Sequence, residues 1–290
     1  MPSRGPRDLI FTLFGEYLLH RPGPVWVGSL IDLLEPLGLS EGAVRSALSR
    51  MGGRGWLVSE RRGRNAFYDL TDRGRELLEE GERRIYRPSR EEPWDGRWQL
   101  VSYSIPEEER TLRDRLRTRL TWLGFGSLGN GLRVTPHDAA GRVEEIADEL
   151  GIADRVELFE GRHLGFSDAG RLVERCWDLP DIHERYLDFI DRHLPEYERF
   201  RADRRDDELS REEAYVHRFD LVHEYREFAL VDPYLPGELL PDDWAGECAA
   251  GLFRSLHDLL EAPAEAHVDA VLDRAEAGTD STVSTAEVAR

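Results

Sequence analysis

The chain has no lysine, only two cysteines and no long run of apolar residues. Cys176 and Cys248 are isolated, so the sequence predicts neither a disulfide framework nor a zinc site. No stretch approaches the roughly 18 apolar residues that are typical of a membrane span. The first residues lack the apolar core of a signal peptide, so we expect a cytoplasmic protein with no membrane partner. We interpret the absence of lysine as codon bias rather than as a functional signal.

Catalytic and metal-binding motifs are also missing. The sequence contains no Gly-x-Ser-x-Gly, no HExxH and no glycine-rich phosphate loop. The nine histidines are scattered, and His217 and His223 are spaced for opposed faces of a helix. We therefore expect no enzyme activity, no metal and no cofactor.

The net charge of −19 is unevenly distributed. Residues 1–87 carry 14 arginines and 12 acidic residues, a net charge of +2, and residues 40–75 alone carry +4. Residues 88–290 carry a net charge of −21. Because an acidic surface repels nucleic acid, any contact with DNA should be confined to the basic stretch and depend on salt. At 290 residues and 40% hydrophobic content, the chain should be globular with two or three domains.

The basic stretch opens with a predicted helix that Ser40 caps through its hydroxyl group. Four apolar residues recur along one side at helical spacing: Val44, Ala47, Leu48 and Met51. The other side presents Arg45, Ser46, Ser49 and Arg50. Arginine binds guanine edges through two hydrogen bonds and serine reaches bases or phosphates, so this face suits a major groove.

A basic hairpin is predicted after the glycines that follow this helix. Trp56–Val58 and Ala66–Leu70 have strand character, and Arg61–Asn65 should form the turn between them. The turn places three arginines at the tip, where they reach a phosphate or a narrow minor groove. The predicted DNA-binding residues are Ser40, Arg45, Ser46, Ser49, Arg50, Arg61, Arg62, Arg64 and Asn65. The alternative is an ordinary solvated surface.

The flanking segments favour a winged helix-turn-helix over residues 1–87. An apolar first helix is expected over 8–19, a pairing strand over 25–27, and a second helix over 29–37. Gly38 and Leu39 then form the tight turn that precedes the DNA-reading helix. Thr71 should cap a further helix over 72–86.

The rest of the chain predicts an α+β protein of several domains. Residues 88–93 are proline-rich and polar and read as a linker. Residues 94–167 alternate strands and helices, which suggests a ferredoxin-like domain with one strand hidden near 125–128. Residues 168–263 are mainly helical, with expected helices at 171–177, 182–194, 212–230 and 243–260 and an exposed loop over 201–211. Pro263 should end the packed region, leaving 264–290 as a flexible tail with at most a weak helix.

Several runs resemble one family. The runs, in chain order between residues 11 and 244, are FTLFGEYLL, VWVGSLIDLLEPLGLSEGAVRSALSRMGGRGWL, GRNAFYDLTDRGR, PWDGRWQLVSYSIPEEER, LRTRLTWLGFG and VDPYLPGELLPDDW, and the resemblance extends from about residue 7 to 260. They resemble the PaaX-like family of transcriptional repressors, the phenylacetate-degradation repressors. The middle region is also similar to the small nucleases of CRISPR spacer acquisition, which hold a metal with an aspartate after the first strand. Ser104 stands at that position and cannot replace a carboxylate, so we expect a structural or dimerising domain.

The resemblance implies a homodimeric repressor that binds operator DNA and is released by an acyl- or aryl-coenzyme A thioester. The predicted effector residues are Arg218, His223, Tyr225, Arg226 and Trp244. Arg218 and Arg226 are eight apart on one predicted helix, so both can face one cleft. The alternative is that Arg226 pairs with Asp232 to brace the proline-rich connection. Two other functions stay open: a metal-dependent nuclease in the middle domain, and a winged helix that binds protein instead of DNA.

Overall fold

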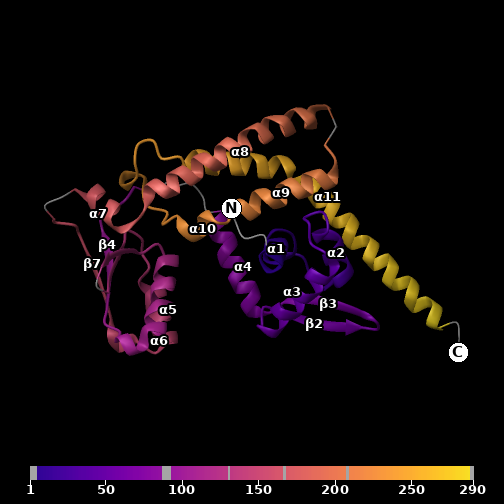
Figure 1. Ribbon diagram of the computed structural model, residues 1–290, viewed down its shortest axis with the longest axis horizontal. Coiled ribbons are helices and arrows are strands. Elements are labelled where there is room, and N and C mark those ends of the chain that lie inside the picture. Colours follow the sequence, from indigo (N-terminus) through magenta and orange to yellow (C-terminus); the bar gives the residue numbers. More distant parts are fainter. Residues whose placement is uncertain (1–4, 87–92, 130, 166–167, 207–208, 288–290) are drawn as a thin grey trace. The chain divides into compact units, whose positions relative to one another are not determined.

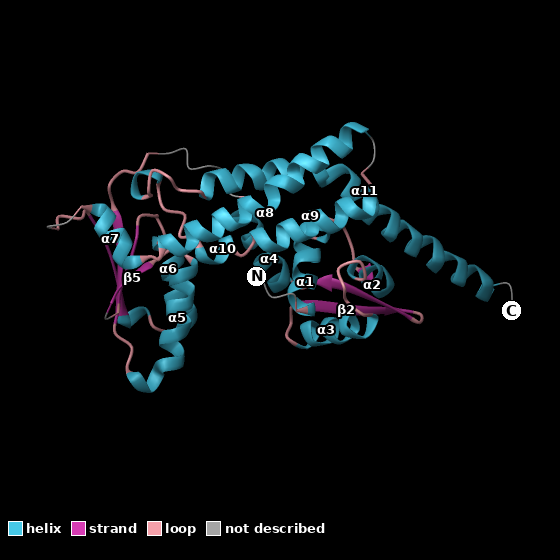
Figure 2. Cartoon of the chain, turned by 45° about the horizontal axis from the view of Figure 1, so that its top comes forward, coloured by secondary structure: helices cyan, strands magenta, loops and turns pink. Residues whose placement is uncertain are grey.

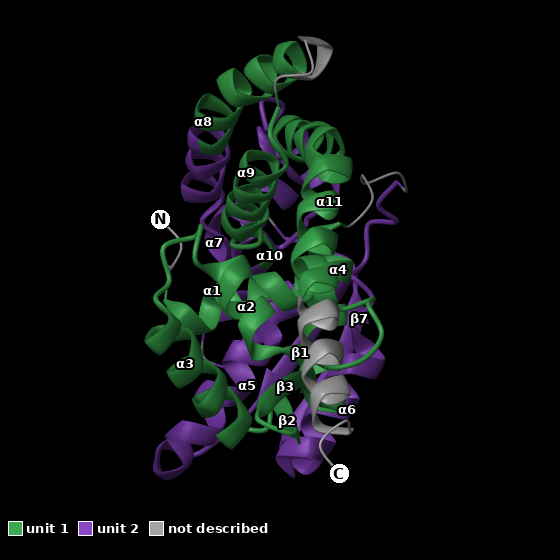
Figure 3. Ribbon diagram, turned by 90° about the vertical axis from the view of Figure 1, so that its right-hand side faces the viewer, with its two compact units in different colours: residues 1–87, 189–229, 248–290 green, residues 88–188, 230–247 purple. Residues whose placement is uncertain are grey.

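The computed structural model of the chain describes residues 5–86, 93–129, 131–165, 168–206 and 209–287. Helices and two small antiparallel sheets make up the fold (Figures 1 and 2), which confirms the expected mixture of helix and strand. The chain forms two compact units (Figure 3). Unit 1 comprises residues 1–87, 189–229 and 248–290, and unit 2 comprises residues 88–188 and 230–247. Across the described residues, each helix is too short or too polar to span a membrane.

The first part of unit 1 contains a small sheet and four helices. The helices are α1 (Pro6–Leu13), which continues as the π-helical turn η1 (Phe14–Leu18), α2 (Val27–Leu34), α3 (Glu41–Gly53) and α4 (Asp72–Ile85). The strands are β1 (Val25–Trp26), β2 (Leu57–Arg62) and β3 (Asn65–Leu70), in the antiparallel order β1-β3-β2. Ser40 and Thr71 cap α3 and α4 by accepting hydrogen bonds from the amides of Ala43 and Gly74. Both predicted caps are confirmed.

The hairpin is longer than the sequence suggested. Arg62 pairs with Asn65 across the strands, so the turn consists of Gly63 and Arg64 alone. Gly63 has a φ of +62°, which a glycine at the first position of a two-residue hairpin turn adopts without strain. The expected turn over 61–65 was therefore too wide, because the strand pairing continues through Arg61 and Arg62. The expected pairing of the 25–27 segment with the hairpin is confirmed for β1, although Val27 already begins α2.

Helices from the C-terminal half complete unit 1. They are the later part of α8 (Leu179–Asp206), α9 (Arg211–Tyr225) and most of α11 (Gly246–Glu287). The Tyr215 hydroxyl donates to the Leu33 carbonyl at 2.6 Å, and His223 Nδ1 lies 2.8 Å from the Thr12 hydroxyl. The Thr12 hydroxyl also lies 3.1 Å from the Asp8 carbonyl of its own helix. The observed units therefore differ from the predicted division after residue 87, because α9 belongs to the core beneath the N-terminal helices.

Two prolines lie inside helices instead of ending them. α8 continues through Pro195 to Asp206, although a loop was expected over 201–211. α11 continues through Pro263, and Ala264, Val268 and Val271 beyond it are buried. A proline inside a helix costs about 3 kcal/mol, and burial of apolar side chains after it offsets that cost. The expectation that the packed region ends at Pro263 was wrong. Of the predicted linker 88–93, only residue 93 lies within the described residues, and the tail is described only to residue 287.

Unit 2 is built on a four-stranded antiparallel sheet in the order β5-β6-β4-β7. Its elements follow the chain as β4 (Trp98–Tyr103), α5 (Arg110–Trp122), β5 (Gly126–Gly129), β6 (Leu132–Thr135), α6 (Ala140–Leu150) and β7 (Val156–Gly161). The hidden strand expected near 125–128 is present as β5. The main core includes Val101, Leu116, Leu120, Val143 and Ile146.

The short helix α7 (Ala169–Cys176) contacts β5, and the proline-rich segment 232–244 belongs to the same unit. The Asp232 carboxylate accepts hydrogen bonds from the Tyr186 hydroxyl and the Tyr234 amide. These bonds brace the start of the segment.

A buried histidine joins α8 to α9 within unit 1. His193 is 5% exposed, with Nδ1 2.7 Å from Glu196 and Nε2 3.2 Å from Glu224. Both ring nitrogens face carboxylates, so both donate only when the imidazole is charged. Burial lowers the pKa of His193, but the bonds to the two carboxylates outweigh it and raise the pKa above its usual range. For the Glu196 carboxyl, burial raises the pKa, but the neighbouring His193 and His217 outweigh this effect and lower the pKa to about 2.

Replacing His193 with glutamine is expected to lower the free energy of unfolding by about 1.5–3 kcal/mol at pH 6, the contribution of a hydrogen bond to a charged group. Because the pKa of His193 is higher in the folded state, the charged imidazole stabilises the fold fully below the unfolded pKa of about 6.5. This stabilisation is lost as the pH rises through the folded pKa. The difference between wild type and His193→Gln in urea unfolding should therefore shrink at pH 9. An equal difference at both pH values would contradict this account of His193.

Candidate nucleic-acid interface

The outer face of α3 is polar and open to solvent. Arg45, Ser46, Ser49 and Arg50 are all exposed. The opposite face is buried, since Val44, Ala47, Leu48 and Met51 are each at most 1% exposed. The helix therefore rests on the core through one side and presents two arginines and two serines on the other. Ser40 precedes this face, and its hydroxyl is already used as the cap.

A hollow of about 430 Å³ lies between α3 and the hairpin. Three of its lining residues are arginines: Arg45 from α3, Arg61 from β2 and Arg64 from the turn. The remaining lining residues carry no charge: Trp26, Val27, Gly63, Asn65 and Ala66. Because no acidic side chain lines it, the hollow favours an anionic group such as a phosphate. Arg45 also forms an exposed ion pair with Glu41 at 2.7 Å.

Arg62 differs from the other two hairpin arginines. Its guanidinium lies over the Phe67 ring, 4.6 Å from the centroid, and pairs with Glu60 at 2.5 Å. Arg61 lines the hollow, whereas Arg62 is not among the residues that line it. The sequence predicts the three arginines as one group at the tip, whereas the hollow brings Arg61 and Arg64, but not Arg62, together with Arg45.

Trp26 is part of the hollow and was not among the predicted site residues. It is brought there by β1, where it pairs with Phe67 of β3. The predicted pairing of the 25–27 segment with the hairpin was the available signal. The predicted pairing identifies a strand at 25–27, but it does not tell which side chain of that strand reaches the hollow.

The five predicted effector residues do not form one pocket. Arg218 is buried and pairs with Glu16 at 3.0 Å and with Glu265 at 3.1 Å. His223 bonds to Thr12, as described above, and Tyr225 stacks on Phe253 with centroids 3.9 Å apart.

Arg226 and Trp244 complete that set. Arg226 follows α9, and burial lowers its pKa. Trp244 belongs to unit 2, whereas the other four predicted residues belong to unit 1. Arg218 lines a hollow of about 400 Å³ in unit 1, and none of the other four is among the residues that line it.

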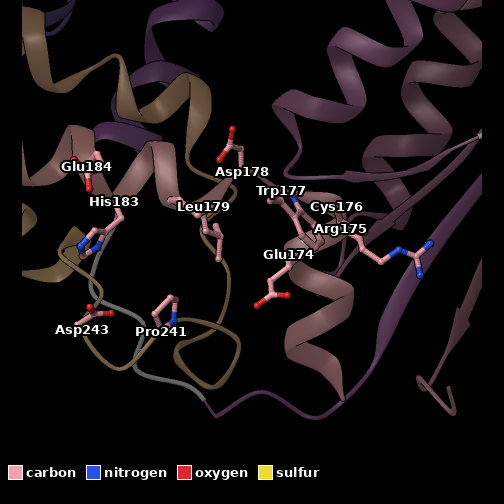
Figure 4. Close-up of a pocket in the computed structure, with 11 residues that line it drawn as sticks. Glu174, Arg175, Cys176, Trp177, Asp178, Leu179, His183, Glu184, Pro241 and Asp243 are labelled. Carbon is pink, nitrogen blue, oxygen red and sulfur yellow. The ribbon is translucent and has the colours of Figure 1, made fainter. Parts of the chain in front are cut away.

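Unit 2 contains a larger hollow, of about 700 Å³, at the junction of α7 and α8 (Figure 4). Leu179 and Pro241 are among its apolar lining residues. Acidic side chains predominate among the charged ones: Glu174, Asp178, Glu184 and Asp243 against Arg175. In Figure 4 the Arg175 side chain extends away from the open space. This charge disfavours the phosphates of a coenzyme A thioester, and none of the five predicted effector residues lines the hollow.

Comparison with known families gives three consecutive matches. They are "PaaX-like protein" at residues 5–74, "PaaX protein central Cas2-like domain" at 91–173 and "PaaX-like protein C-terminal domain" at 177–270. The Transcriptional repressor PaaX of Escherichia coli (strain K12) is 39% identical over 265 residues, which covers 90% of this chain and 82% of that protein. This chain belongs to the PaaX-like family. The resemblance inferred from the sequence is confirmed, and the family is one of regulators, not of enzymes.

A solved structure is similar to this PaaX-like chain over most of its length. The Uncharacterized protein Rv0674 from Mycobacterium tuberculosis aligns with a TM-score of 0.57 at 26% identity. The alignment covers 93% of this chain and 99% of that one. All nine predicted DNA-binding residues fall within the first PaaX-like match, residues 5–74.

The matched central domain is Cas2-like, so the nuclease alternative depends on whether Ser104 can serve as a metal ligand. β4 ends at Tyr103, and Ser104 follows it as an exposed residue. A hydroxyl group there is a poor ligand for a hard divalent cation. Within the part of the chain that the structure describes, no three histidine, cysteine or acidic side chains are grouped to hold a metal ion.

Proposed function

We propose that this protein is a transcriptional repressor that binds double-stranded operator DNA through a winged helix made of α1 to α4 and the β2–β3 hairpin. The observation that carries the proposal is the exposed arginine–serine face of α3 beside a hollow lined by three arginines and no acid. This face belongs to residues 40–75, whose net charge is +4 in a chain of net charge −19. Membership in the PaaX-like family supports the same function, which places the protein with chromosomal DNA in the cytoplasm.

In this proposal, α3 enters the major groove and the hairpin contacts the backbone beside it. Arg45 and Arg50 are long enough to reach base edges, where arginine binds guanine through two hydrogen bonds. Arg61 and Arg64 face a phosphate or the adjacent minor groove. The winged helix is thus the basic surface that we assign to DNA. The rest of the chain is acidic and repels the duplex, which confines binding to the winged helix.

Replacing Arg61 and Arg64 together with alanine is expected to weaken binding to all duplex sequences. Each lost phosphate contact should reduce the slope of log affinity against log salt by about one. A fluorescence-anisotropy titration at several salt concentrations measures both quantities. The matched control is Arg62→Ala, which removes an arginine of the same hairpin that faces Phe67 and should leave the salt slope unchanged. If Arg62→Ala flattens the slope as much as the double variant, the assignment of the hollow to phosphate is wrong.

A homodimer is the second part of the proposal. One recognition helix reads too few base pairs to be selective, and two-fold proteins match pseudo-palindromic sites with half-sites whole helical turns apart. The strand order of unit 2 and its two intervening helices support a ferredoxin-like domain, to which we assign a structural or dimerising role in place of a nuclease role. The same titration, run at stoichiometric concentrations, should reach saturation at two chains per operator.

An effector that releases DNA is the third part. The family supports an acyl- or aryl-coenzyme A thioester. Of the five predicted effector residues, Arg218 lines a hollow in unit 1, so we keep it as the candidate contact. Its guanidinium is already paired, so an effector phosphate must displace Glu16 or Glu265 from it. If a broad panel of thioesters neither binds the full chain nor releases its DNA, this part of the proposal fails while the DNA-binding part stands.

A further inference from the structure

Unit 1 contains a buried ion pair between Glu16 and Arg218, whose side chains are 3% and 5% exposed. The two residues lie 3.0 Å apart, from Glu16 Oε1 to Arg218 Nη2. The same carboxylate accepts a hydrogen bond from the Tyr86 hydroxyl at 2.5 Å and lies 2.9 Å from His257 Nε2. A single carboxylate thereby joins η1, the end of α4, α9 and α11.

The backbone at Glu16 is itself unusual. Glu16 lies inside η1, a π-helical turn that continues α1. Such turns insert one extra residue, change the direction of the side chains around them, and occur often at functional sites. The Glu16 side chain is 3% exposed, so the carboxylate is held on the inner side of the helix. The distortion and the buried charge occur at the same place.

Stability alone does not account for this pair. Two charges lose their hydration when they are buried, and well-packed apolar residues of similar volume often stabilise a fold equally well or better. In some proteins a buried polar or charged group instead specifies one arrangement of the helices, because its partners are satisfied in that arrangement and not in neighbouring ones. A fixed arrangement is therefore the property to which the pair contributes most.

The helices that the pair fixes flank the DNA-reading elements on both sides. α1, which leads into η1, packs on α3. Tyr86 follows α4, the helix that begins directly after the wing strand β3. A movement of α9 or α11 that breaks the contacts of Glu16 therefore acts on the segment before α2 and α3 and on the segment after the hairpin.

Further ion pairs extend this network. Glu265 of α11 lies 3.1 Å from Arg218 and 2.5 Å from Arg21 of the N-terminal segment, so it is shared between two arginines. Arg21 also pairs with Asp269 at 2.5 Å. The hollow of about 400 Å³ adjoins these side chains and leaves room for them to change partners. Discrete alternative pairings are what a two-state element requires.

We propose that Glu16 and Arg218 are positioning residues that couple the DNA affinity of the winged helix to the arrangement of α9 and α11. The inference rests on the proposed DNA-binding function and adds its regulation. A ligand that displaces Arg218 from Glu16 loosens α3 and the hairpin, which must then be ordered again when DNA binds. By linkage, DNA binding in turn stabilises the contacts on α9 and α11.

The test uses the full chain and a duplex that the wild-type protein selects from a random pool. In the double variant Glu16→Met/Arg218→Met, both charges are replaced by apolar side chains, so the fold and melting temperature should be kept. Its affinity for the duplex should fall about tenfold. The winged helix is then no longer preorganised, so part of the binding free energy is used to order it. The salt slope should stay the same, because no phosphate contact is removed.

Hydrogen exchange supplies a readout that a purely structural role would not change. Adding the duplex to the wild type should slow amide exchange in α9 and α11, and the double variant should lose this effect. Wild-type affinity together with wild-type exchange in the double variant would overturn the coupling. If that variant does not fold, Tyr86→Phe removes only the hydroxyl that donates to Glu16; it should lose affinity about threefold, and unchanged affinity would overturn the inference. If the wild type selects no duplex at all, the proposed function itself has failed.

Discussion

Replacing Arg218 with methionine is expected to lower the free energy of unfolding by about 3 kcal/mol, within the range of about 3–5 kcal/mol for breaking a buried ion pair. The variant leaves the Glu16 carboxylate buried without its arginine partner. Tyr86 and His257 still contact that carboxylate, which places the expected loss at the lower end of the range. Urea unfolding followed by circular dichroism measures the difference.

The double variant Glu16→Met/Arg218→Met is the control for this prediction. It removes the unpaired carboxylate along with its partner, so most of the lost stability should return. A single variant that costs less than about 1 kcal/mol would show that the carboxylate is not desolvated as the structure indicates. A double variant as unstable as the single one would show that the packing of the arginine stem, and not the charge, stabilises this region.

Reversing the charge of Arg45 and Arg50 together is expected to reduce operator affinity at least about 100-fold. Each base or phosphate contact of this kind contributes about 1–3 kcal/mol, and glutamate adds repulsion from the duplex. Both side chains are exposed, so the fold should be unaffected, although the weak pair of Arg45 with Glu41 is lost. Anisotropy titration of Arg45→Glu/Arg50→Glu measures the affinity, and thermal melting checks the fold.

The matched control for that variant makes the same change in net charge on unit 2. Arg110 and Arg142 are exposed arginines of α5 and α6 that pair with Asp114 and Glu145. Arg110→Glu/Arg142→Glu should change affinity by no more than a few-fold, through long-range repulsion that salt screens. Equal losses in the two double variants would mean that net charge, and not the face of α3, governs DNA binding.

Local features of this fold were predictable because a few neighbouring residues determine them. The apolar spacing of α3 gave its buried and exposed sides, and the hydroxyl groups of Ser40 and Thr71 marked two helix starts. The weak strand β5 was inferred from the alternation around it. The α3 pattern and the two caps follow from periodicity or capping within a few turns, whereas β5 follows from the alternation of strands and helices over residues 94–167.

Features that depend on distant partners were not predictable from the sequence. The prolines at 195 and 263 are local helix-breaking signals, but burial of residues beyond them decides that α8 and α11 continue. Glu16 and Arg218 are far apart in the chain, and no local pattern brings them together. In the hairpin, a shift of one residue in the register moves a side chain to the opposite face. The sequence therefore identified the arginines but not which of them share the hollow.

The salt dependence of DNA binding is the decisive test of whether the winged helix binds duplex DNA. The full wild-type chain is titrated into a labelled duplex selected from a random pool, between about 50 and 200 mM salt. The account predicts that log affinity falls linearly with log salt, with a slope of about −4 or steeper for two winged helices. It further predicts that the slope is flatter for Arg61→Ala/Arg64→Ala and unchanged for Arg62→Ala. Affinity that does not respond to salt, or no binding to any duplex, would contradict the assignment of the winged helix to DNA.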